Sequence, residues 1–246
     1  MDGHHTGKGT VIAAVLAGLL AIPAFLLAPI LVVLAAVPLV VGLVALTRGE
    51  RRVGLALTVV GALLTLPGAA ALVLLKPYRI PSESMTATLG VGDRVLATRF
   101  GGADPQPGDV IVFHPPAAAT GGKTGEEACG VAPPEGAACP QPSAGDSSES
   151  FVSRVIAVGG DRLTVVGGRA VVNGAAIAEP YVRPRCPSGE TADFPTEITI
   201  PAGHVFVMSD NRQCSFDSRF YGPVRRSAVE GTVLFRFRPL SRVGRL

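Results

Sequence analysis

Serine hydroxyls that could act as nucleophiles recur in the second half of this sequence. Ser82 and Ser84 lie two positions apart with Met85 after them, and Ser153 and Ser215 lie further along the chain. They fall among four motifs, which cover residues 78–89, 107–113, 151–161 and 209–219. A serine attacks a carbonyl carbon when a neighbouring base takes its proton and hydrogen-bond donors stabilise the oxyanion. The motifs therefore raise the question of which serine reacts and what activates it.

Two long apolar runs precede the serine motifs. Residues 11–46 contain no charged side chain, and neither do residues 53–75. About 20 apolar residues cross a bilayer as a helix, so residues 53–75 are expected to form one transmembrane helix. Residues 11–46 would form either two spans that turn near Pro29 or one tilted, kinked helix. Their apolar core is longer than that of a cleaved signal peptide; a buried core helix of a soluble protein is the remaining alternative.

The charges around these runs predict an orientation. Residues 47–52 carry three arginines, which the positive-inside rule places in the cytoplasm. With two spans in residues 11–46, residues 1–10 would lie in the cytoplasm too. Residues 77–246 would then lie outside the cytoplasm, at the cell membrane and beside its lipid. This segment has 17 basic and 17 acidic residues, and the whole chain has a net charge of only +3. Binding to nucleic acid is therefore not expected.

Residues 77–246 have the pattern of a mainly β domain. Short β-branched runs bounded by glycine or proline predict strands at 93–99, 109–113, 151–158, 204–208 and 232–238. Two hairpins are expected within residues 162–177, at the turns Gly167-Gly168 and Asn173-Gly174. Residues 117–150 are rich in Ala, Gly, Pro and Ser and predict a flexible insert that buries no core. The expected fold class is N-terminal transmembrane helices followed by a mainly β extracytoplasmic domain.

All four cysteines lie in the expected extracytoplasmic domain, at Cys129, Cys139, Cys186 and Cys214. An even number of cysteines in an oxidising compartment indicates disulfides, and four cysteines allow three pairings. We favour Cys129 with Cys139, which would close a short loop in the insert, and Cys186 with Cys214. A zinc site is the rival interpretation, but the sequence has no C-x2-C spacing and this domain contains only two histidines, His114 and His204.

The order and spacing of the four motifs resemble those of the bacterial type I signal peptidases, membrane-anchored serine endopeptidases that remove signal peptides from exported precursor proteins. The resemblance covers nearly all of residues 78–222, and the ending at residues 239–244 is also similar. It implies a signal-peptidase-like β fold at the bacterial plasma membrane, precursor proteins as partners, and a serine mechanism without a cofactor or metal. Penicillin-binding enzymes need Ser-x-x-Lys, which is absent, and the apolar runs argue against soluble self-cleaving repressors.

The resemblance also implies roles for single residues. Ser84 matches the nucleophile, and the hydroxyl of Ser82 together with the backbone N–H of Ser84 matches the oxyanion hole. Ser215 matches a serine that orients the base. The supporting residues are Arg154 and the ion pair of Asp217 with Arg219, which would brace the loop.

One position departs from the family pattern. The family has a lysine as general base directly before the arginine of the third motif, and this sequence has Ser153 there. A serine hydroxyl does not accept a proton near neutral pH, whereas a buried lysine with a lowered pKa does. A replacement base would have to come from Lys8, Lys76, Lys123, His114 or His204. We expect the Ser153 side chain to point at Ser84, with Ser215 nearby.

The sequence also predicts how a substrate would bind. Nine residues separate Leu75 from Ser84, at most about 30 Å of extended chain, so the nucleophile is expected close to the outer membrane surface. Exported precursors present an extended A-x-A segment, which could add to the edge of a sheet. The resemblance implies that the edges are residues 79–82 and the strand up to Val152, which the family positions beside the nucleophile. The side chains of Ile80, Met85 and Val152 would line small pockets for that segment.

The sequence is compatible with three functions. The first is a signal peptidase I-like serine endopeptidase with an unidentified base. The second is a catalytically impaired or inactive relative that binds signal peptides or partners an active paralogue. The third is a membrane-anchored structural β domain, which the four motifs argue against.

Overall fold

The chain divides into two compact units, and the boundary falls after Lys76. In this computed structural model the described residues are 33, 36–99, 104–120, 126–182, 193–213 and 215–246. The first unit runs to Lys76 and also includes Arg245; the second comprises Pro77–Gly244 and Leu246.

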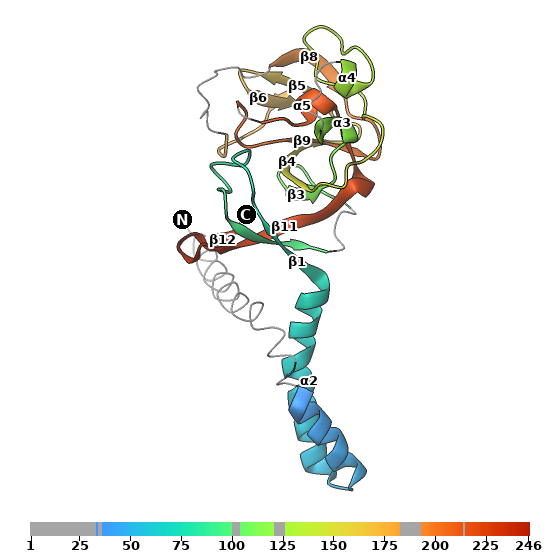
Figure 1. The fold of residues 1–246 in the computed structure, drawn as a ribbon, viewed down its shortest axis with the longest axis vertical. Helices are drawn as coiled ribbons and strands as arrows, with labels where there is room; N and C mark the ends of the chain where they lie inside the picture. Colours follow the sequence, from blue (N-terminus) through green and yellow to red (C-terminus); the bar gives the residue numbers. More distant parts are fainter. Residues whose placement is uncertain (1–32, 34–35, 100–103, 121–125, 183–192, 214) are drawn as a thin grey trace, which may run out of the picture. The chain divides into compact units, whose positions relative to one another are not determined.

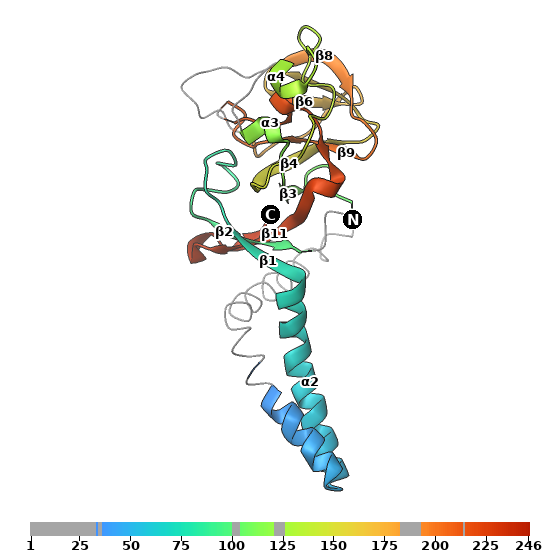
Figure 2. The ribbon, with the colours of Figure 1, turned by 45° about the vertical axis from the view of Figure 1, so that its right-hand side comes forward.

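The first unit is a tight pair of antiparallel helices, residues 36–47 and α2 (Arg51–Leu74). Gly49 turns the chain between them at φ +87°, a backbone conformation that glycine adopts easily. A Cβ atom on Gly61 would lie 2.6 Å from the backbone nitrogen of Leu39, and one on Gly42 would lie 2.6 Å from that of Thr58. Small residues therefore let the two backbones touch, as Figure 2 shows for the blue and teal helices.

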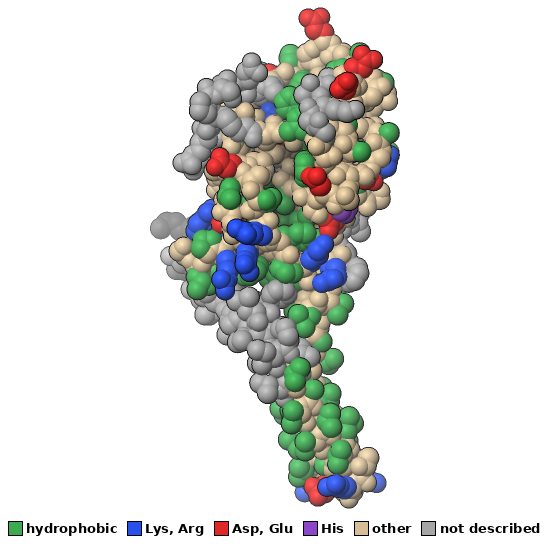
Figure 3. Space-filling model, in the orientation of Figure 1, with side chains coloured by type: hydrophobic (Ala, Val, Ile, Leu, Met, Phe, Trp, Pro, Cys, Tyr) green, Lys and Arg blue, Asp and Glu red, His purple; other side chains and the backbone are tan. Residues whose placement is uncertain are grey.

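Large apolar side chains cover the outside of this helix pair, and charged side chains gather at its tip (Figure 3). Val37, Leu55, Leu63 and Leu66 are all exposed. Within the residues that the structure describes, however, no helix is both long and apolar enough to cross a membrane. The spans predicted at residues 11–46 and 53–75 are therefore not confirmed, and residues 11–32 lie outside the described part of the chain.

The second unit is built from two β-sheets, which confirms the mainly β fold class. The larger sheet has the order β1-β2-β11-β3-β4-β9-β10, with β12 paired to β11. Its strands are β1 (Leu75–Arg79), β2 (Arg94–Thr98), β3 (Val110–Phe113), β4 (Phe151–Val158), β9 (His204–Met208), β10 (Val224–Arg225), β11 (Val229–Arg238) and β12 (Gly244–Arg245). The long strand β11 joins the two halves of the sheet, because it pairs with β3 through Thr232 and with β2 from Val233 onward.

The smaller sheet has the order β7-β6-β5-β8 and lies at the far end of the domain from β1 (Figure 1). Its strands are β5 (Arg162–Val166), β6 (Arg169–Val172), β7 (Ala175–Ala176) and β8 (Phe194–Thr199). The turns Gly167-Gly168 and Asn173-Gly174 join the first three strands as predicted, and all four of these residues have positive φ. Strand β8 was not predicted; it has mostly exposed side chains and contains Pro195, a residue that sheets tolerate at an edge.

The prediction that residues 117–150 bury no core is wrong. The insert contains the one-turn helices α3 (Ala117–Thr120) and α4 (Glu126–Cys129), which are too short to show a helical period. Ala137 and Ala138 belong to the core beneath the smaller sheet, and Ala119 belongs to a second core cluster. Small alanine side chains thus fill the interior without any long apolar run that the sequence would reveal.

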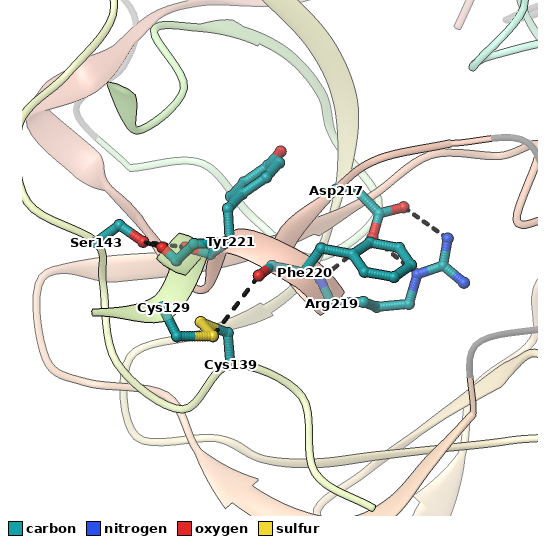
Figure 4. The surroundings of a disulfide bond; sticks show 8 residues. Cys129, Cys139, Ser143, Asp217, Arg219, Phe220 and Tyr221 are labelled. Atoms are coloured by element: carbon teal, nitrogen blue, oxygen red, sulfur yellow. Dashed lines mark hydrogen bonds and ion pairs between the residues drawn. A yellow bond between two sulfur atoms is a disulfide. The ribbon is translucent and has the colours of Figure 1, made fainter. Parts of the chain in front are cut away.

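A disulfide between Cys129 and Cys139 closes the insert and packs it against the one-turn helix α5 (Ser218–Tyr221). The Sγ atom of Cys129 lies 3.6 Å from the carbonyl oxygen of Phe220, and the Ser143 hydroxyl donates a 2.8 Å hydrogen bond to that of Tyr221 (Figure 4). This is the first of the two favoured pairings. Cys186 and Cys214 lie outside the described residues.

Candidate active site

The loop after β1 carries Ser84 and is anchored by apolar side chains on its inner side. Met85 and Leu89 are fully buried, in a core cluster that also contains Ile80 and Val95. Within the loop, the backbone N–H of Leu89 donates a 2.8 Å hydrogen bond to the carbonyl of Met85. The side chains around Ser84 therefore hold the backbone, while Ser84 itself remains partly exposed.

The hydroxyls of Ser82 and Ser84 lie 3.1 Å apart, which is hydrogen-bonding distance. The backbone of their loop is fixed by Asn211, whose N–H donates to the carbonyl of Ser84 at 2.9 Å. The side-chain amide of Asn211 donates to the carbonyl of Glu83 at 3.3 Å. Two segments far apart in sequence are thus joined directly behind the predicted nucleophile.

Ser153 lies in β4, opposite Ile111 of β3, and is only 3% exposed. Its hydroxyl lies 3.5 Å from that of Ser209, which is also buried. Ser209 was not predicted as a site residue, although it follows β9 immediately and begins the fourth motif. Each hydroxyl can donate to the other, so this interior end of the site is polar and internally satisfied.

Arg154 connects the three segments that form the site. Its Nε donates to Oδ1 of Asp210 at 2.9 Å and its Nη2 to Oδ2 at 2.8 Å. Thr88, from the loop that carries Ser84, donates a hydrogen bond from its hydroxyl to the same carboxylate. Burial alone would lower the pKa of Arg154, but the hydrogen bond and charge of Asp210 raise it overall. The guanidinium therefore stays charged and ties β4 to both loops.

The predicted ion pair of Asp217 with Arg219 is present and fully buried, with Nε and Oδ1 2.8 Å apart. Asp217 also accepts a 3.0 Å hydrogen bond from the backbone N–H of Ser209. Ser215 donates its hydroxyl to the carbonyl of Asn211 at 2.6 Å. The fourth motif is therefore braced by its own charged side chains.

A third buried ion pair, Arg212 with Glu179, was not predicted. Glu179 also accepts from the backbone N–H of Ala170 at 2.9 Å, and Arg212 donates to the carbonyl of Gly168 at 2.9 Å. Beside this pair, the ring of Tyr181 lies 3.9 Å from the guanidinium carbon of Arg154. Burial, and then the charge of Glu179, raise the pKa of Tyr181 to about 12. Nothing in the local sequence indicates these contacts, because they join separate segments.

A cavity of about 500 Å3 collects the predicted site residues. The lining includes every predicted catalytic, oxyanion and substrate-contacting residue, namely Ser82, Ser84, Ser153, Ile80, Met85 and Val152, and also Ser215. Arg154, Asp217 and Arg219 do not line the cavity and support it from behind. The structure thus brings Ser84, Ser153 and Ser215 to one cleft, although the nearest hydroxyl to Ser153 is that of Ser209.

Two strand edges flank this cleft. Strand β1 is the end strand of its sheet, so one of its edges has no partner strand among the described strands. Residues 151–153 of β4 pair with β3 on one side, and β9 begins to pair with β4 only at Arg154. Both segments contribute to the cavity lining. Each segment therefore has one side without a partner strand among the described strands, the kind of sheet edge to which an extended peptide can add.

The two histidines considered as alternative bases lie outside the cleft lining. His114 and His204 place Nδ1 3.0 and 2.9 Å from the carbonyl oxygens of Glu149 and Ala202. Neither histidine lines the cavity. Lys76 belongs to the first unit, and Lys8 and Lys123 lie outside the described residues.

Comparisons with known proteins agree on one family. The sequence profile of the signal peptidase family, peptidase S26, matches residues 52–238. A signal peptidase I of Leptolyngbya laminosa is 34% identical over 68% of this chain and 70% of its own length. A probable signal peptidase I-1 of Synechocystis sp. is 34% identical over 70% and 75%. The signal peptidase I of Mycobacterium tuberculosis is 37% identical over 61% and 56%.

Structural likeness is weaker than sequence likeness. A signal peptidase I of Enterococcus faecalis with a solved structure aligns with 52% of this chain and 96% of its own, at 21% identity and a TM-score of 0.35. The assignment therefore rests on the sequence matches, which are extensive. On that basis the chain belongs to the signal peptidase family, peptidase S26.

Proposed function

We propose that this protein is a serine endopeptidase that removes signal peptides from precursor proteins. Ser84 would attack the scissile carbonyl, with the Ser82 hydroxyl and the Ser84 backbone N–H stabilising the oxyanion. The observation that carries the proposal is one cleft in which the hydroxyls of Ser82 and Ser84 lie 3.1 Å apart and to whose lining the end strand β1 and residues 151–153 of β4 contribute. An extended segment with small side chains would lie along those edges against Ile80, Met85 and Val152.

Proton transfer would be the slow part of this reaction. No lysine or histidine appears among the described residues that line the cleft. Ser153 and Ser209 lie at its interior end instead, and neither hydroxyl takes up a proton near neutral pH. We therefore expect cleavage to be slow, with Ser84 losing its proton to solvent or to a group from outside the described residues.

The same observation supports a second candidate function. A relative without a base would still have the two edges and the apolar side chains that recognise an extended peptide. Such a protein would bind signal peptides, or partner an active paralogue, without cleaving them.

A cleavage assay separates the two functions. A precursor with an A-x-A site is incubated with the wild-type chain and with Ser84→Ala, and the same variants are tested for binding of the A-x-A peptide. Slow cleavage that disappears in Ser84→Ala supports the endopeptidase. Equal background cleavage with retained binding supports the binding relative, and absence of both rejects the proposed site.

We also propose that the β domain lies outside the cytoplasm of a bacterial cell, beside the membrane lipid, with residues 1–10 and 47–52 inside. Three arginines at residues 47–52 support this orientation. The Cys129–Cys139 disulfide supports it too, because such bonds persist in oxidising compartments. In intact cells, a membrane-impermeant maleimide should label a cysteine introduced at Glu197 and should not label one introduced at Arg51.

A further inference from the structure

Glu230 lies beside the cleft on β11, outside the four motifs, and its side chain is 15% exposed. Its Oε2 atom accepts a 2.8 Å hydrogen bond from the hydroxyl of Tyr78. Its Oε1 atom accepts a hydrogen bond from the hydroxyl of Ser150. Tyr78 and Ser150 both line the cleft, and they belong to its two different edges. One carboxylate therefore bonds to both edges at once.

His114 adds a second connection to one of these edges. Its Nε2 atom lies 3.7 Å from Oε1 of Glu230. Its Nδ1 atom lies 3.0 Å from the carbonyl oxygen of Glu149, so Nδ1 must carry the hydrogen, because a carbonyl only accepts. Glu149 and Ser150 lead directly into residues 151–153, the part of β4 that pairs with β3 but not with β9. The position of that edge is thus set from β3 and β11 together.

We propose that Glu230 is a positioning residue that fixes the separation of the two edges between which an extended peptide binds. The inference rests on the proposed function, because it concerns the same cleft. A strand that inserts between two edges needs about 4.8 Å on each side, so the spacing decides whether both edges bond to it. Hydrogen bonds to a charged acceptor are about twice as strong as neutral ones, and edges that are already fixed lose little entropy on binding.

The test compares Glu230→Ala and Glu230→Gln with Glu197→Ala, in the full-length chain. Glu197 is a suitable control because it forms an exposed ion pair with Arg162 on the smaller sheet. Hydrogen exchange is measured at residues 77–82 and 148–153, and the affinity for a labelled A-x-A peptide is measured by anisotropy. We expect Glu230→Ala to raise exchange at both edges and to weaken peptide binding roughly tenfold. Glu230→Gln should have a smaller effect, since its amide oxygen still accepts one hydrogen bond.

The two readouts separate the inference from the proposed function. Faster exchange confined to both edges, with exchange in β5 and β6 unchanged, supports the positioning role; a general loss of stability would raise exchange everywhere. Unchanged hydrogen exchange at the edges overturns the positioning role, whatever the measured affinity for the peptide. Faster exchange at the edges in a protein whose wild type binds no peptide keeps the role of Glu230 in the cleft and overturns the proposed function.

Discussion

The loop that carries Ser84 and strand β4, which carries Ser153, form two sides of the cleft. The two serines differ in burial and in their hydrogen-bonding neighbours. Ser84 is partly exposed, its hydroxyl lies near that of Ser82, and its backbone is fixed by Asn211. Ser153 is almost fully buried, and its hydroxyl lies near that of Ser209. The two sides share a frame, since Arg154 and Asp210 join β4 to both loops. The contacts of Arg154 and Asp210 described above for this frame do not include the Ser153 side chain, whose hydroxyl lies near that of Ser209 instead.

The largest effect is expected when position 153 receives an amine. Ser153→Lys should raise cleavage of an A-x-A precursor by about 10²–10⁴-fold, which is what a positioned acid–base group supplies. Burial would lower the pKa of the new amine, and the neutral amine would then accept the proton of Ser84.

Ser153→Met is the matched control, because it adds a similar chain without the amine and should bring no gain. A wild-type chain that already cleaves at normal rates, with no increase in Ser153→Lys, would show that another base acts.

The second-largest effect is expected when the frame formed by Arg154 and Asp210 is broken. Asp210→Ala leaves the guanidinium of Arg154 buried without its partner, and removing one member of a buried ion pair typically costs 3–5 kcal/mol of unfolding free energy. Urea denaturation measures the loss. Glu197→Ala, at an exposed pair, should cost less than about 1 kcal/mol; equal losses in the two variants would contradict the importance of the frame.

Removing the disulfide should have a moderate effect behind the fourth motif. The double variant Cys129→Ser/Cys139→Ser should lower the free energy of unfolding by about 2–3 kcal/mol, as the loop spans 10 residues. It should also raise hydrogen exchange in α5, against which the insert packs. If exchange in α5 stays unchanged, the insert does not brace that helix.

The smallest effect is expected at Tyr181, on the outer side of Arg154. Its pKa of about 12 lies above the ordinary value of 10.0. A raised pKa favours the neutral phenol in the folded state, so this contribution to stability is present below about pH 10 and is lost as the pH rises through about 12. The Tyr181→Phe variant should lack the tyrosinate absorbance that appears near pH 12. If the absorbance titration of Tyr181→Phe is identical to that of the wild type, the ionisation near pH 12 does not belong to Tyr181.

Local patterns predicted much of the fold. The β-branched runs and the glycine turns predicted β2, β3, β4 and the hairpins of the smaller sheet, because strand and turn preferences act over a few residues. β8 was missed because its exposed residues carry no alternation that distinguishes a strand. The insert was misjudged because alanines become core only when distant segments cover them.

The residues of the candidate site were likewise predictable from the sequence only in part. Ser82, Ser84, Ser153 and Ser215 could be selected from the sequence because they fall in ordered motifs. Ser209 was passed over although it begins the fourth motif. Glu179, Tyr181 and Glu230 could not be selected, since each matters only through a partner in another segment. Long-range pairs of this kind are a property of the folded chain.

The unpaired strand edges have a consequence for the design of inhibitors. A ligand that mimics an extended strand would take its affinity from main-chain hydrogen bonds, which the side chain at position 153 does not alter. On the proposed function, in which no base for Ser84 lines the cleft among the described residues, a compound with a reactive group that depends on an activated serine would label Ser84 poorly. Strand mimics should therefore bind with similar affinity to this protein and to a relative with lysine at this position. Serine-reactive compounds would label the two proteins at different rates.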